Sequence, residues 1–567
     1  MNTHSTEPRN TKPRNTELRT VTRDDVAHAA SALLDSGMRL VLIACHEDDE
    51  SFRIVYSFAG AQNRVELSVS VPREDAWIPS LASFSFPAGN FEREIRDLYG
   101  VQPRNHPQPH RLVRHGHWPR GWYPMLRSAA EIPEFEPDVE SFPFVEVEGP
   151  GVYEIAVGPI HAGIIEPGHF RFSVVGETIV RMEARQWYLH RGVEKLFEGL
   201  SAAEGIALAE QVTGDTGVGH SLAFVMAVED AAGIEVSEPD RLVRALLLEM
   251  ERLYNHVTDL GSLANDVGFG IVDAHAQSLR EQLLRINKTV TGHRFLRGAL
   301  LVGGAQVLRL PDPVDLRRIQ AAVEELVAVS LSHAIVRSRF AGTAVLPAPQ
   351  AGTIGTLGYV ARASGLDVDA RRDHPFVNLG ESFHVVTEER GDVLARYRVR
   401  AREFSISVAV IVDLVARLGP STGTGTAVVP TQPGAGLSLV EAGAARLRIV
   451  SSSTLADCSA GSRSSTPRSS TGRHFPWPCR RRSSPTSRSP IRASTSPTPA
   501  TTSRRARLPG ARSLIPHAST SGQPACQRPY LESCSMVRKR ACESVRLDSS
   551  IRLAAASSST VPSSRSV

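Results

Sequence analysis

Hydrophobic residues in the first part of the chain recur with two different periods. Residues 24–36 place apolar positions three and four apart, which is the spacing of an amphipathic helix. Residues 38–44, 52–59 and 64–71 instead show the alternation and the β-branched content of strands. This mixture of periods within one short stretch predicts an α+β N-terminal domain.

The hydrophobic pattern changes further along the chain. Short strand-like runs at 153–157, 169–175 and 177–183 come first. Long segments with helical periodicity follow at 242–260, 275–289, 313–337 and 400–418. The second part is therefore predicted to be a mainly α-helical domain with a small β-sheet.

Polar stretches flank and separate these two domains. The first 20 residues are polar and repeat the letters PRNT, which is typical of a disordered segment. The predicted organisation is a disordered N-terminus (1–20), the α+β domain (21–130), a linker (131–150), the helical domain (151–442) and a disordered, low-complexity basic tail (443–567).

The tail differs sharply from the body in charge. Residues 451–567 contain 19 Lys and Arg against 4 Asp and Glu, whereas residues 1–450 contain 45 against 56. With synonymous codons chosen for three separate tail segments, one missing base near codon 443 accounts for all three. We therefore predict that the tail is read out of frame. A natural disordered tail of this composition is the alternative.

The composition of the body argues against several classes of protein. Its acidic excess predicts no nucleic-acid partner, and the alternative is a tail that binds nucleic acid through its arginines. Cys45 is the only cysteine before Cys458, so the body lacks thiolates for a disulfide or a metal cage. No window of 18 uncharged apolar residues occurs, so we predict no transmembrane segment.

A charged motif lies in the predicted α+β domain. Residues 91–100 (FEREIRDLYG) have the pattern of a charged helical turn that ends at a glycine cap, and His106, Pro107 and Arg111 follow. Together these residues resemble the 30-kDa subunit of respiratory complex I. The resemblance implies that they are structural and contact other subunits, without a part in chemistry.

Further motifs occur in order in the predicted helical domain. They are GPIH at 158–161, EPGHFR at 166–171, YLHRGVEK at 188–195, HSLAF at 220–224, AVE at 227–229, EMERLYNH at 249–256 and a glycine-flanked segment at 355–365. The chain thus resembles the large subunit of group 4 nickel–iron hydrogenases, of the formate hydrogenlyase and hydrogenase-4 type. It also resembles the homologous 49-kDa subunit of complex I, and the fusion of the 30-kDa and 49-kDa parts in this order resembles the arrangement of the hydrogenlyase large subunit.

The chain departs from hydrogenases at the metal ligands. Where those proteins carry two cysteines before a histidine, residues 211–220 place Thr213 and Thr216 at the cysteine positions. A threonine hydroxyl is too hard a donor, with too high a pKa, to replace a thiolate on nickel. We therefore predict degenerate metal-ligand positions, no metal site and no cofactor bound by this chain.

Quinone chemistry is what the resemblance to complex I implies instead. In that family a histidine of the first β-hairpin contacts the quinone headgroup, and His169 matches its position; the usual tyrosine partner is replaced by Leu208. His161, Asp215 and His220 are further candidates for the quinone site. Ordinary structural histidines, and a role for Asp215 in a glycine-rich turn, are the alternatives.

Glu194 matches the glutamate that relays protons in hydrogenases. A carboxylate near a buried interface can have a raised pKa and pass protons, so Glu194 and His169 are the predicted catalytic residues. The alternative for Glu194 is an ion pair with Arg191 or Lys195 on the same helical turn.

The predicted function is that of an electron-transfer subunit in a membrane-associated oxidoreductase of the hydrogenase-4 or complex I type, acting on a quinone. The expected partners are a small subunit with a 4Fe-4S cluster and the subunits of a membrane arm; NAD enters only by analogy with complex I. The chain is expected in the cytoplasm, at the inner face of the cell membrane. A non-catalytic scaffold subunit and a true nickel–iron hydrogenase are the alternatives.

Overall fold

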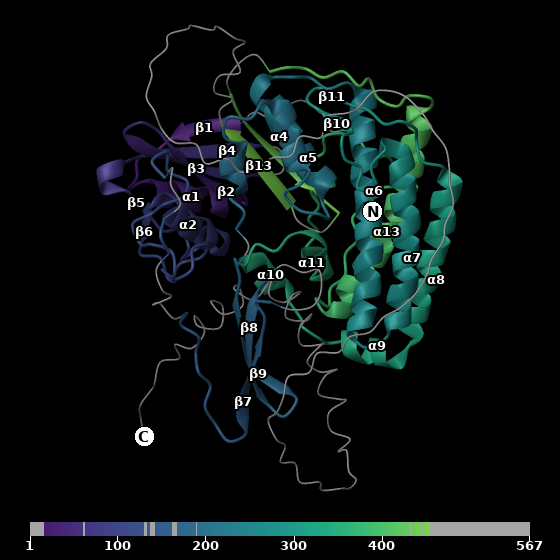
Figure 1. Ribbon diagram of the computed structural model, residues 1–567, viewed down its shortest axis with the longest axis horizontal. Coiled ribbons are helices and arrows are strands. Elements are labelled where there is room, and N and C mark those ends of the chain that lie inside the picture. The colour runs from purple at the N-terminus through teal and green to yellow at the C-terminus, as the bar shows by residue number, and fades with distance from the viewer. Residues whose placement is uncertain are drawn as a thin grey trace, which may run out of the picture. The chain divides into compact units, whose positions relative to one another are not determined.

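The computed structural model describes residues 16–60, 63–129, 133–135, 142–160, 167–188, 190–430, 434–443 and 447–453. Within these ranges a sheet-containing region is followed by a helical region with small sheets (Figure 1), which confirms the two predicted domain classes. The predictions for His161, for residues 1–15 and for the tail beyond residue 453 lie outside the described residues.

The N-terminal sheet forms where the sequence alternates. Its strand order is β1 (Thr16–Thr20), β4 (Arg64–Pro72), β3 (Ser51–Ala59) and β2 (Arg39–Glu47). The pairs β2–β3 and β3–β4 are antiparallel. Ile54, Tyr56 and Leu67 are inaccessible to solvent and share a core with helix α1 (Val26–Asp35), so the predicted helix and strands build one hydrophobic layer.

Strand β1 corrects the prediction that residues 1–20 are all disordered. It pairs in parallel with residues 64–68 of β4, and all five of its side chains are exposed. Backbone hydrogen bonds to the sheet edge therefore form this strand, without burial of apolar side chains. Such a strand leaves no hydrophobic pattern in the sequence.

Helix α2 (Phe86–Tyr99) carries the charged motif and ends, as predicted, at a glycine with φ of +85°. Its charged side chains hold the loop that follows. The carboxylate of Asp97 accepts hydrogen bonds from the backbone N–H groups of Leu112 and Val113 at 2.7 and 2.9 Å. Arg93 donates to two carbonyl oxygens of the same loop at 2.8 and 3.1 Å. The motif thus fixes the proline- and histidine-rich loop against the helix.

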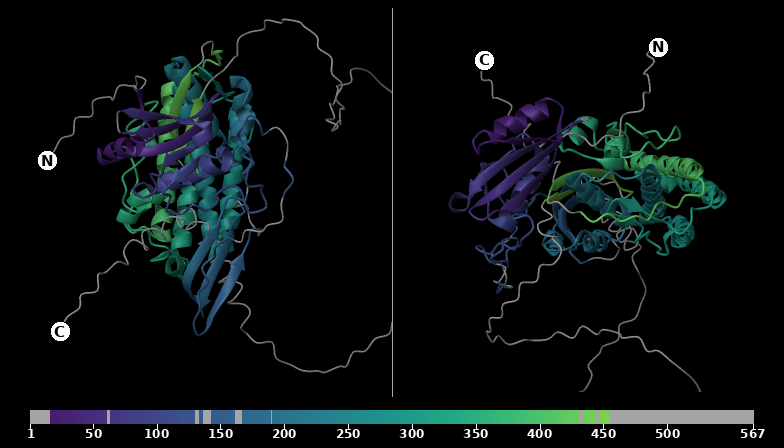
Figure 2. Two further views of the ribbon diagram at one scale, coloured as in Figure 1. Left: turned by 90° about the vertical axis from the view of Figure 1, so that its left-hand side faces the viewer. Right: turned by 90° about the horizontal axis from the view of Figure 1, so that it is seen from above.

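A three-stranded antiparallel sheet opens the second region (Figure 2). Its strands are β7 (Val152–Val157), β8 (His169–Val175) and β9 (Thr178–Arg185). Phe170, Phe172 and Val174 of β8 lie in a small apolar core on one face, and the positions between them are polar. The three predicted strands are confirmed to within two residues at each end.

Long helices build the core of the second region. They are α5 (Gly217–Ala232), α6 (Glu238–Asp266), α7 (Gly270–Thr291), α8 (Pro313–Ser332) and α13 (Val393–Leu418). The last four lie side by side in both figures. Leu246, Leu253 and Leu260 of α6 are inaccessible to solvent, as the helical spacing predicts.

The segment 313–337 is two helices and not the single helix that its periodicity predicts. Helix α8 ends at Ser332, and α9 (Ala334–Phe340) leaves at 82°. Between them His333 has an extended backbone and stacks on Phe269, with ring centroids 4.2 Å apart. Within the described ranges no single helix has the length and hydropathy of a membrane span; the bent pair meets both criteria only when taken together.

The last described segment packs into the second region. Strand β12 (Ala435–Glu441) pairs with β13 (Leu447–Ser453) and lies against α5. At Gly436 an added Cβ would lie 2.1 Å from the carbonyl oxygen of Ala227, so only glycine permits this approach. Strand β13 falls within the segment predicted to begin the tail.

Short elements complete the description. They are the 3-10 helix η1 (Arg73–Asp75), β5 (Trp77–Pro79), β6 (Gln102–Arg104), α3 (Val193–Phe197), α4 (Ala202–Ala209), β10 (Leu300–Leu301), β11 (Gly304–Ala305), α10 (Ala348–Thr353), α11 (Gly358–Ala363) and α12 (Ala370–Asp373). Strands β5 and β6 pair in parallel, and β10 and β11 pair antiparallel.

Candidate functional site

Strand β8 begins at His169 and places it on the polar face of the three-stranded sheet. Its directly paired residue on β9 is Arg185, and Arg171 follows two positions later on the same face. Phe144, from the segment predicted as a linker, lies over these residues. Its ring centroid is 5.5 Å from that of His169 and 4.3 Å from the guanidinium carbon of Arg171. The linker therefore contributes to this face.

Both ring nitrogens of His169 have hydrogen-bond partners. Nδ1 lies 3.0 Å from the carbonyl oxygen of Gly158, which can only accept, so Nδ1 carries the proton. Nε2 lies 3.3 Å from Nε of Arg171, which can only donate, so Nε2 accepts. These two bonds hold a neutral imidazole in one tautomer and one orientation. Leu208 is half-buried on α4.

The turn between α4 and α5 brings together the degenerate metal-ligand residues. The Oγ1 atoms of Thr213 and Thr216 are 2.5 Å apart, and Nδ1 of His220 lies 3.1 Å from Oγ1 of Thr216. The same Nδ1 lies 2.8 Å from the carbonyl oxygen of Thr216, so it carries the proton. Thr216 and His220 are buried. Hydrogen bonds between the three residues therefore hold this turn closed.

This set of donors does not fit a nickel–iron centre. The side chains of Thr213 and Thr216 offer hard hydroxyl oxygens where nickel prefers soft thiolates. Among the described residues no group of three or more His, Cys, Asp or Glu side chains is arranged to hold a metal ion. No chemistry at this turn is therefore assigned to a metal.

Asp215 supports the same turn mainly through its backbone. Its carbonyl oxygen accepts hydrogen bonds from Oη of Tyr254 at 3.0 Å and from Nδ2 of Asn255 at 2.8 Å. Its carboxylate is exposed and lies 3.3 Å from Oγ1 of Thr216. These contacts are those of a turn residue. No described contact joins this turn to His169, so a shared quinone site for Asp215, His220 and His169 stays a prediction.

Glu194 lies on α3 with its side chain exposed. The neighbouring Lys195 pairs with Glu198 at 3.0 Å. Burial raises the pKa of Glu94 on α2 to about 7, and the charge of Glu194 adds to this effect. Burial lowers the pKa of His190, while Glu194 opposes that change. Glu194 thus acts electrostatically on Glu94 and His190, among other titratable groups, and its role as a proton relay stays a prediction.

The motif EMERLYNH on α6 forms a charged centre that the sequence analysis did not identify as a site. Glu249, Arg252 and His256 lie on one side of the helix because they are three and four residues apart, and all are buried. The carboxylate of Glu249 lies 3.1 Å from Arg252 and 3.2 Å from Arg371. Nε2 of His256 lies 2.9 Å from the carboxylate of Glu403 on α13.

Arg362 on α11 links these ion pairs to β12. Its guanidinium lies 2.7 Å from Glu403, 2.9 Å from Glu441 and 3.4 Å from Asp369. Burial opposes ionisation of Asp369, but Arg371 and Arg362 outweigh it and hold its pKa at about 2. The buried charge cluster, as we call it, consists of Glu249, Arg252, His256, Arg362, Asp369, Arg371, Glu403 and Glu441.

The other side of α6 supports the start of α5. The carboxylate of Glu251 accepts hydrogen bonds from the backbone N–H groups of Val218 at 2.7 Å and Gly219 at 3.1 Å. These groups lack partners within their own helix, so Glu251 acts as a cap from a distant helix. Burial raises the pKa of Glu251 to about 8, although the two N–H groups lower it. A carboxyl group of this kind can hold and release a proton near neutral pH.

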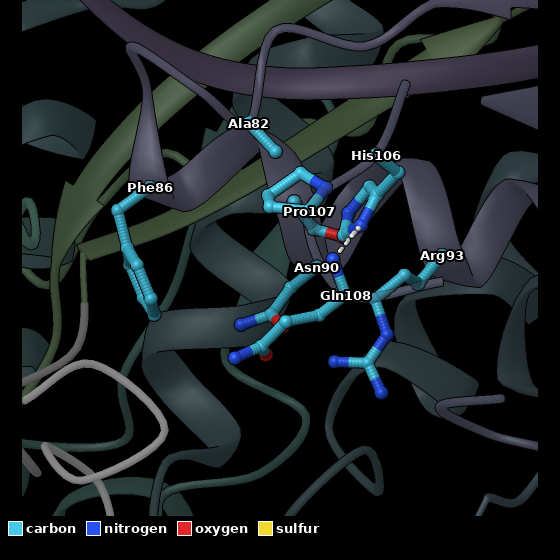
Figure 3. Close-up of a pocket in the computed structure, with 8 residues that line it drawn as sticks. Ala82, Phe86, Asn90, Arg93, His106, Pro107 and Gln108 are labelled. Carbon is cyan, nitrogen blue, oxygen red and sulfur yellow. Dashed lines mark hydrogen bonds between the residues drawn. The ribbon is translucent and has the colours of Figure 1, made fainter. Parts of the chain in front are cut away.

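A small pocket lies beside α2, with Asn90, Arg93 and Gln108 around it (Figure 3). Inside it, Nε2 of His106 lies 3.0 Å from the carbonyl oxygen of Gly89, and Nδ1 accepts a hydrogen bond from the backbone N–H of Gln108 at 2.9 Å. Burial lowers the pKa of His106. With both nitrogens engaged in backbone contacts, this histidine has a structural role in the pocket.

Comparisons with known proteins agree with the motifs. Residues 19–133 match the family described as the respiratory-chain NADH dehydrogenase 30 Kd subunit, and residues 266–445 match the 49 Kd subunit. The resemblance predicted from the motifs is thereby confirmed for both parts of the chain.

Three relatives illustrate the similarity. Formate hydrogenlyase subunit 5 of Escherichia coli is 34% identical over 61% of this chain and 62% of its own length. Hydrogenase-4 component G of Escherichia coli is 35% identical over 56% and 57%. A subunit of the F(420)H(2) dehydrogenase of Methanosarcina mazei is 31% identical over 45% of this chain and 70% of its own length. The chain spans about three fifths of the length of the first two.

Proposed function

We propose that this chain, which belongs to the family of respiratory-chain NADH dehydrogenase 49-kDa subunits joined to the 30-kDa type, is the electron-transfer subunit of a membrane-associated oxidoreductase. The complex would resemble formate hydrogenlyase, hydrogenase-4 and complex I, whose subunits are its relatives. The chain would lie at the inner face of the cell membrane. Its partners would be a small subunit with a 4Fe-4S cluster and the subunits of a membrane arm.

A quinone is the substrate that the polar face of β7–β9 supports. The observation that carries this proposal is the fixed, half-buried pair of His169 and Arg171 beside the ring of Phe144. A flat ring with carbonyl oxygens needs hydrogen-bond donors at its edge and an apolar or cationic surface at its face. At the closed turn the hydroxyl groups of Thr213 and Thr216 are instead engaged with each other and with His220.

Reduction of a quinone to a quinol takes up two electrons and two protons. The electrons would arrive from the partner subunit, and the polar sheet face would hold the headgroup in place. Glu194, exposed on α3, would deliver protons to the reduced ring. In this proposal the chain itself binds neither NAD nor a nickel–iron centre.

The test uses the chain assembled with its small subunit, with a reduced viologen as electron donor and ubiquinone-1 as acceptor. We expect quinol formation and nickel far below one atom per complex. His169→Ala and Glu194→Gln should each lower the rate by roughly 100-fold. His275→Ala and Glu325→Gln, at exposed positions on α7 and α8, serve as matched controls and should leave it unchanged.

Two results would support other functions. Stoichiometric nickel would favour a hydrogenase. An assembled complex whose activity ignores both substitutions would favour a scaffold subunit. A specific observation makes the scaffold worth testing: near Glu194, the apolar side chains of Trp187 and Leu196 are 41% and 56% exposed, as on a surface that a partner covers.

A further inference from the structure

The polar face of β8 and β9 contains three arginines, Arg171, Arg181 and Arg185, and the first two differ in their surroundings. Arg171 is directly opposite Glu183, and Arg181 is directly opposite Ser173. Arg181 bonds to Glu183 at 3.0 Å, whereas Arg171 bonds to His169 at 3.3 Å. Their side chains are equally exposed, at 35% and 36%. Arg171 therefore combines access to solvent with a hydrogen bond to an imidazole, which Arg181 lacks.

His169 itself has no N–H group left for a ligand. Its one proton is on Nδ1 and points to the carbonyl oxygen of Gly158, and Nε2 is an acceptor for Arg171. A carbonyl oxygen of a ligand would require a donor. To offer one, His169 would have to give up one of these bonds or take up a second proton beside a guanidinium group.

Arg171 still has donors. A guanidinium group has five N–H bonds in a planar fork. One of them points to His169, and Nη1 lies 3.3 Å from the carboxylate of Glu154. Among the described residues no other hydrogen-bond partner of this side chain is found. Phe144 covers one face of the group at 4.3 Å and restricts how it can turn.

We propose that Arg171 donates the hydrogen bond to the carbonyl oxygen of a quinone headgroup, and that His169 is the positioning residue that holds Arg171. This inference rests on the proposed function as a quinone-binding subunit. During reduction the carbonyl oxygen gains negative charge, and a fixed guanidinium group stabilises an oxyanion better than a neutral imidazole does. Arg171 would thus bind the oxygen more strongly as the electrons arrive.

The same contacts could serve only to join β7, β8 and the linker. A structural role would make Arg171 matter for folding but not for a ligand. The two roles differ in what they predict for Arg181, which lies on the same face with the same exposure and an ion pair of its own. Arg181→Gln is therefore the matched control.

The binding experiment measures the Kd of ubiquinone-1 by titration calorimetry, on the full chain assembled with its small subunit. We expect Arg171→Gln to raise the Kd roughly 10- to 100-fold, the loss of a charge-assisted hydrogen bond. Arg171→Lys should fall between this variant and the wild type, because the charge remains but the planar fork is lost. Arg181→Gln should bind like the wild type. Circular dichroism and melting curves check that every variant is folded.

A second readout follows the histidine directly. With ¹⁵N-labelled histidine, NMR should show His169 as the Nδ1–H tautomer before and after ubiquinone-1 is added. Conversion to the Nε2–H tautomer or to the doubly protonated ring on binding would mean that His169 is the donor, and would overturn the inference.

The outcomes separate the inference from the proposed function. If the wild type does not bind ubiquinone-1, the proposed function fails. If the wild type binds and Arg171→Gln binds equally well, while His169→Gln does not, the function stands and the role of Arg171 is refuted. If Arg171→Gln and Arg181→Gln weaken binding equally, the effect is one of general charge, and the inference is also refuted.

Discussion

The buried charge cluster and the polar face of β7–β9 use the same kinds of side chain under opposite conditions. Arg362 and Glu403 in the cluster are almost completely shielded from water. Arg171 and Glu154 on the sheet keep 36% and 40% of their side chains exposed. A buried charge has no solvent to replace a lost partner, whereas an exposed one does. The cluster is therefore suited to holding helices together. A side chain on the sheet face can instead replace its protein partner with a ligand.

This difference shows that charge by itself does not mark a functional site. The cluster contains eight buried charged or titratable side chains, which ion pairs of 2.7 to 3.4 Å join to one another. The site proposed here has weaker pairs but accessible N–H groups. Four predictions test the contrast, beginning with the largest effect.

Removal of Arg362 should break the cluster. Arg362→Ala would leave Glu403, Glu441 and Asp369 without their shared cation in a region closed to water. We expect a loss of about 5 kcal/mol in the free energy of unfolding, measured by urea denaturation. Arg318→Ala, which removes an exposed ion pair with Asp315, is the control and should cost less than about 1 kcal/mol. Similar losses of unfolding free energy in Arg362→Ala and Arg318→Ala would contradict the expected difference between buried and exposed ion pairs.

Glu251 should make stability depend on pH. Its pKa of about 8 in the folded chain is above the usual value of 4.5, so the folded state holds a proton that unfolding releases. Its contribution is full below about pH 4.5 and is lost as the pH rises through about 8. Between pH 5 and pH 8.5 the free energy of unfolding should therefore fall by roughly 3 to 5 kcal/mol more in the wild type than in Glu251→Gln.

The comparison of the two pH profiles isolates Glu251. Burial also raises the pKa of Glu92 and Glu94 to about 7, and both groups remain in the variant. Their contribution therefore cancels in the difference between the two proteins. Parallel profiles for wild type and Glu251→Gln would show that Glu251 is ionised throughout this range.

The turn held by Thr213, Thr216 and His220 should show an intermediate loss of stability. Thr216→Val keeps the shape of the side chain but removes the hydroxyl that contacts Thr213 and His220 inside the protein. We expect a loss of roughly 1 to 2 kcal/mol in the free energy of unfolding, because the buried partners lose a hydrogen bond. Thr213→Val, at the half-buried end of the same contact, should cost less. The reverse order would mean that the turn is held from its outer side.

The sheet face should show the smallest change in stability. Arg171→Gln breaks partly exposed contacts with Glu154 and His169, and we expect less than about 1 kcal/mol in chemical denaturation. The Kd for ubiquinone-1 is nevertheless expected to rise roughly 10- to 100-fold in the same variant. A loss of several kcal/mol would place Arg171 with the structural ion pairs instead.

Much of the fold follows from local pattern. The strands β2, β3, β4 and β8 and the helices α6, α7 and α13 are all found where apolar spacing predicts them. Local pattern fails at His333, because the apolar spacing continues from α8 into α9 while the backbone turns by 82°. It fails again at β1, whose five exposed side chains carry no periodic signal.

The candidate site, like the fold, follows only in part from local sequence. The motifs by themselves identify the family, the histidine at the start of β8 and the two threonines that replace thiolates, because these are matters of residue type and spacing. The partners of those residues are decided only by the tertiary structure. Glu249 meets Arg371, 122 residues away, and Arg362 meets Glu441, 79 residues away. Hydrogen bonds act over about 3 Å, so only the folded chain determines which distant side chains come within that distance and which remain accessible to a ligand.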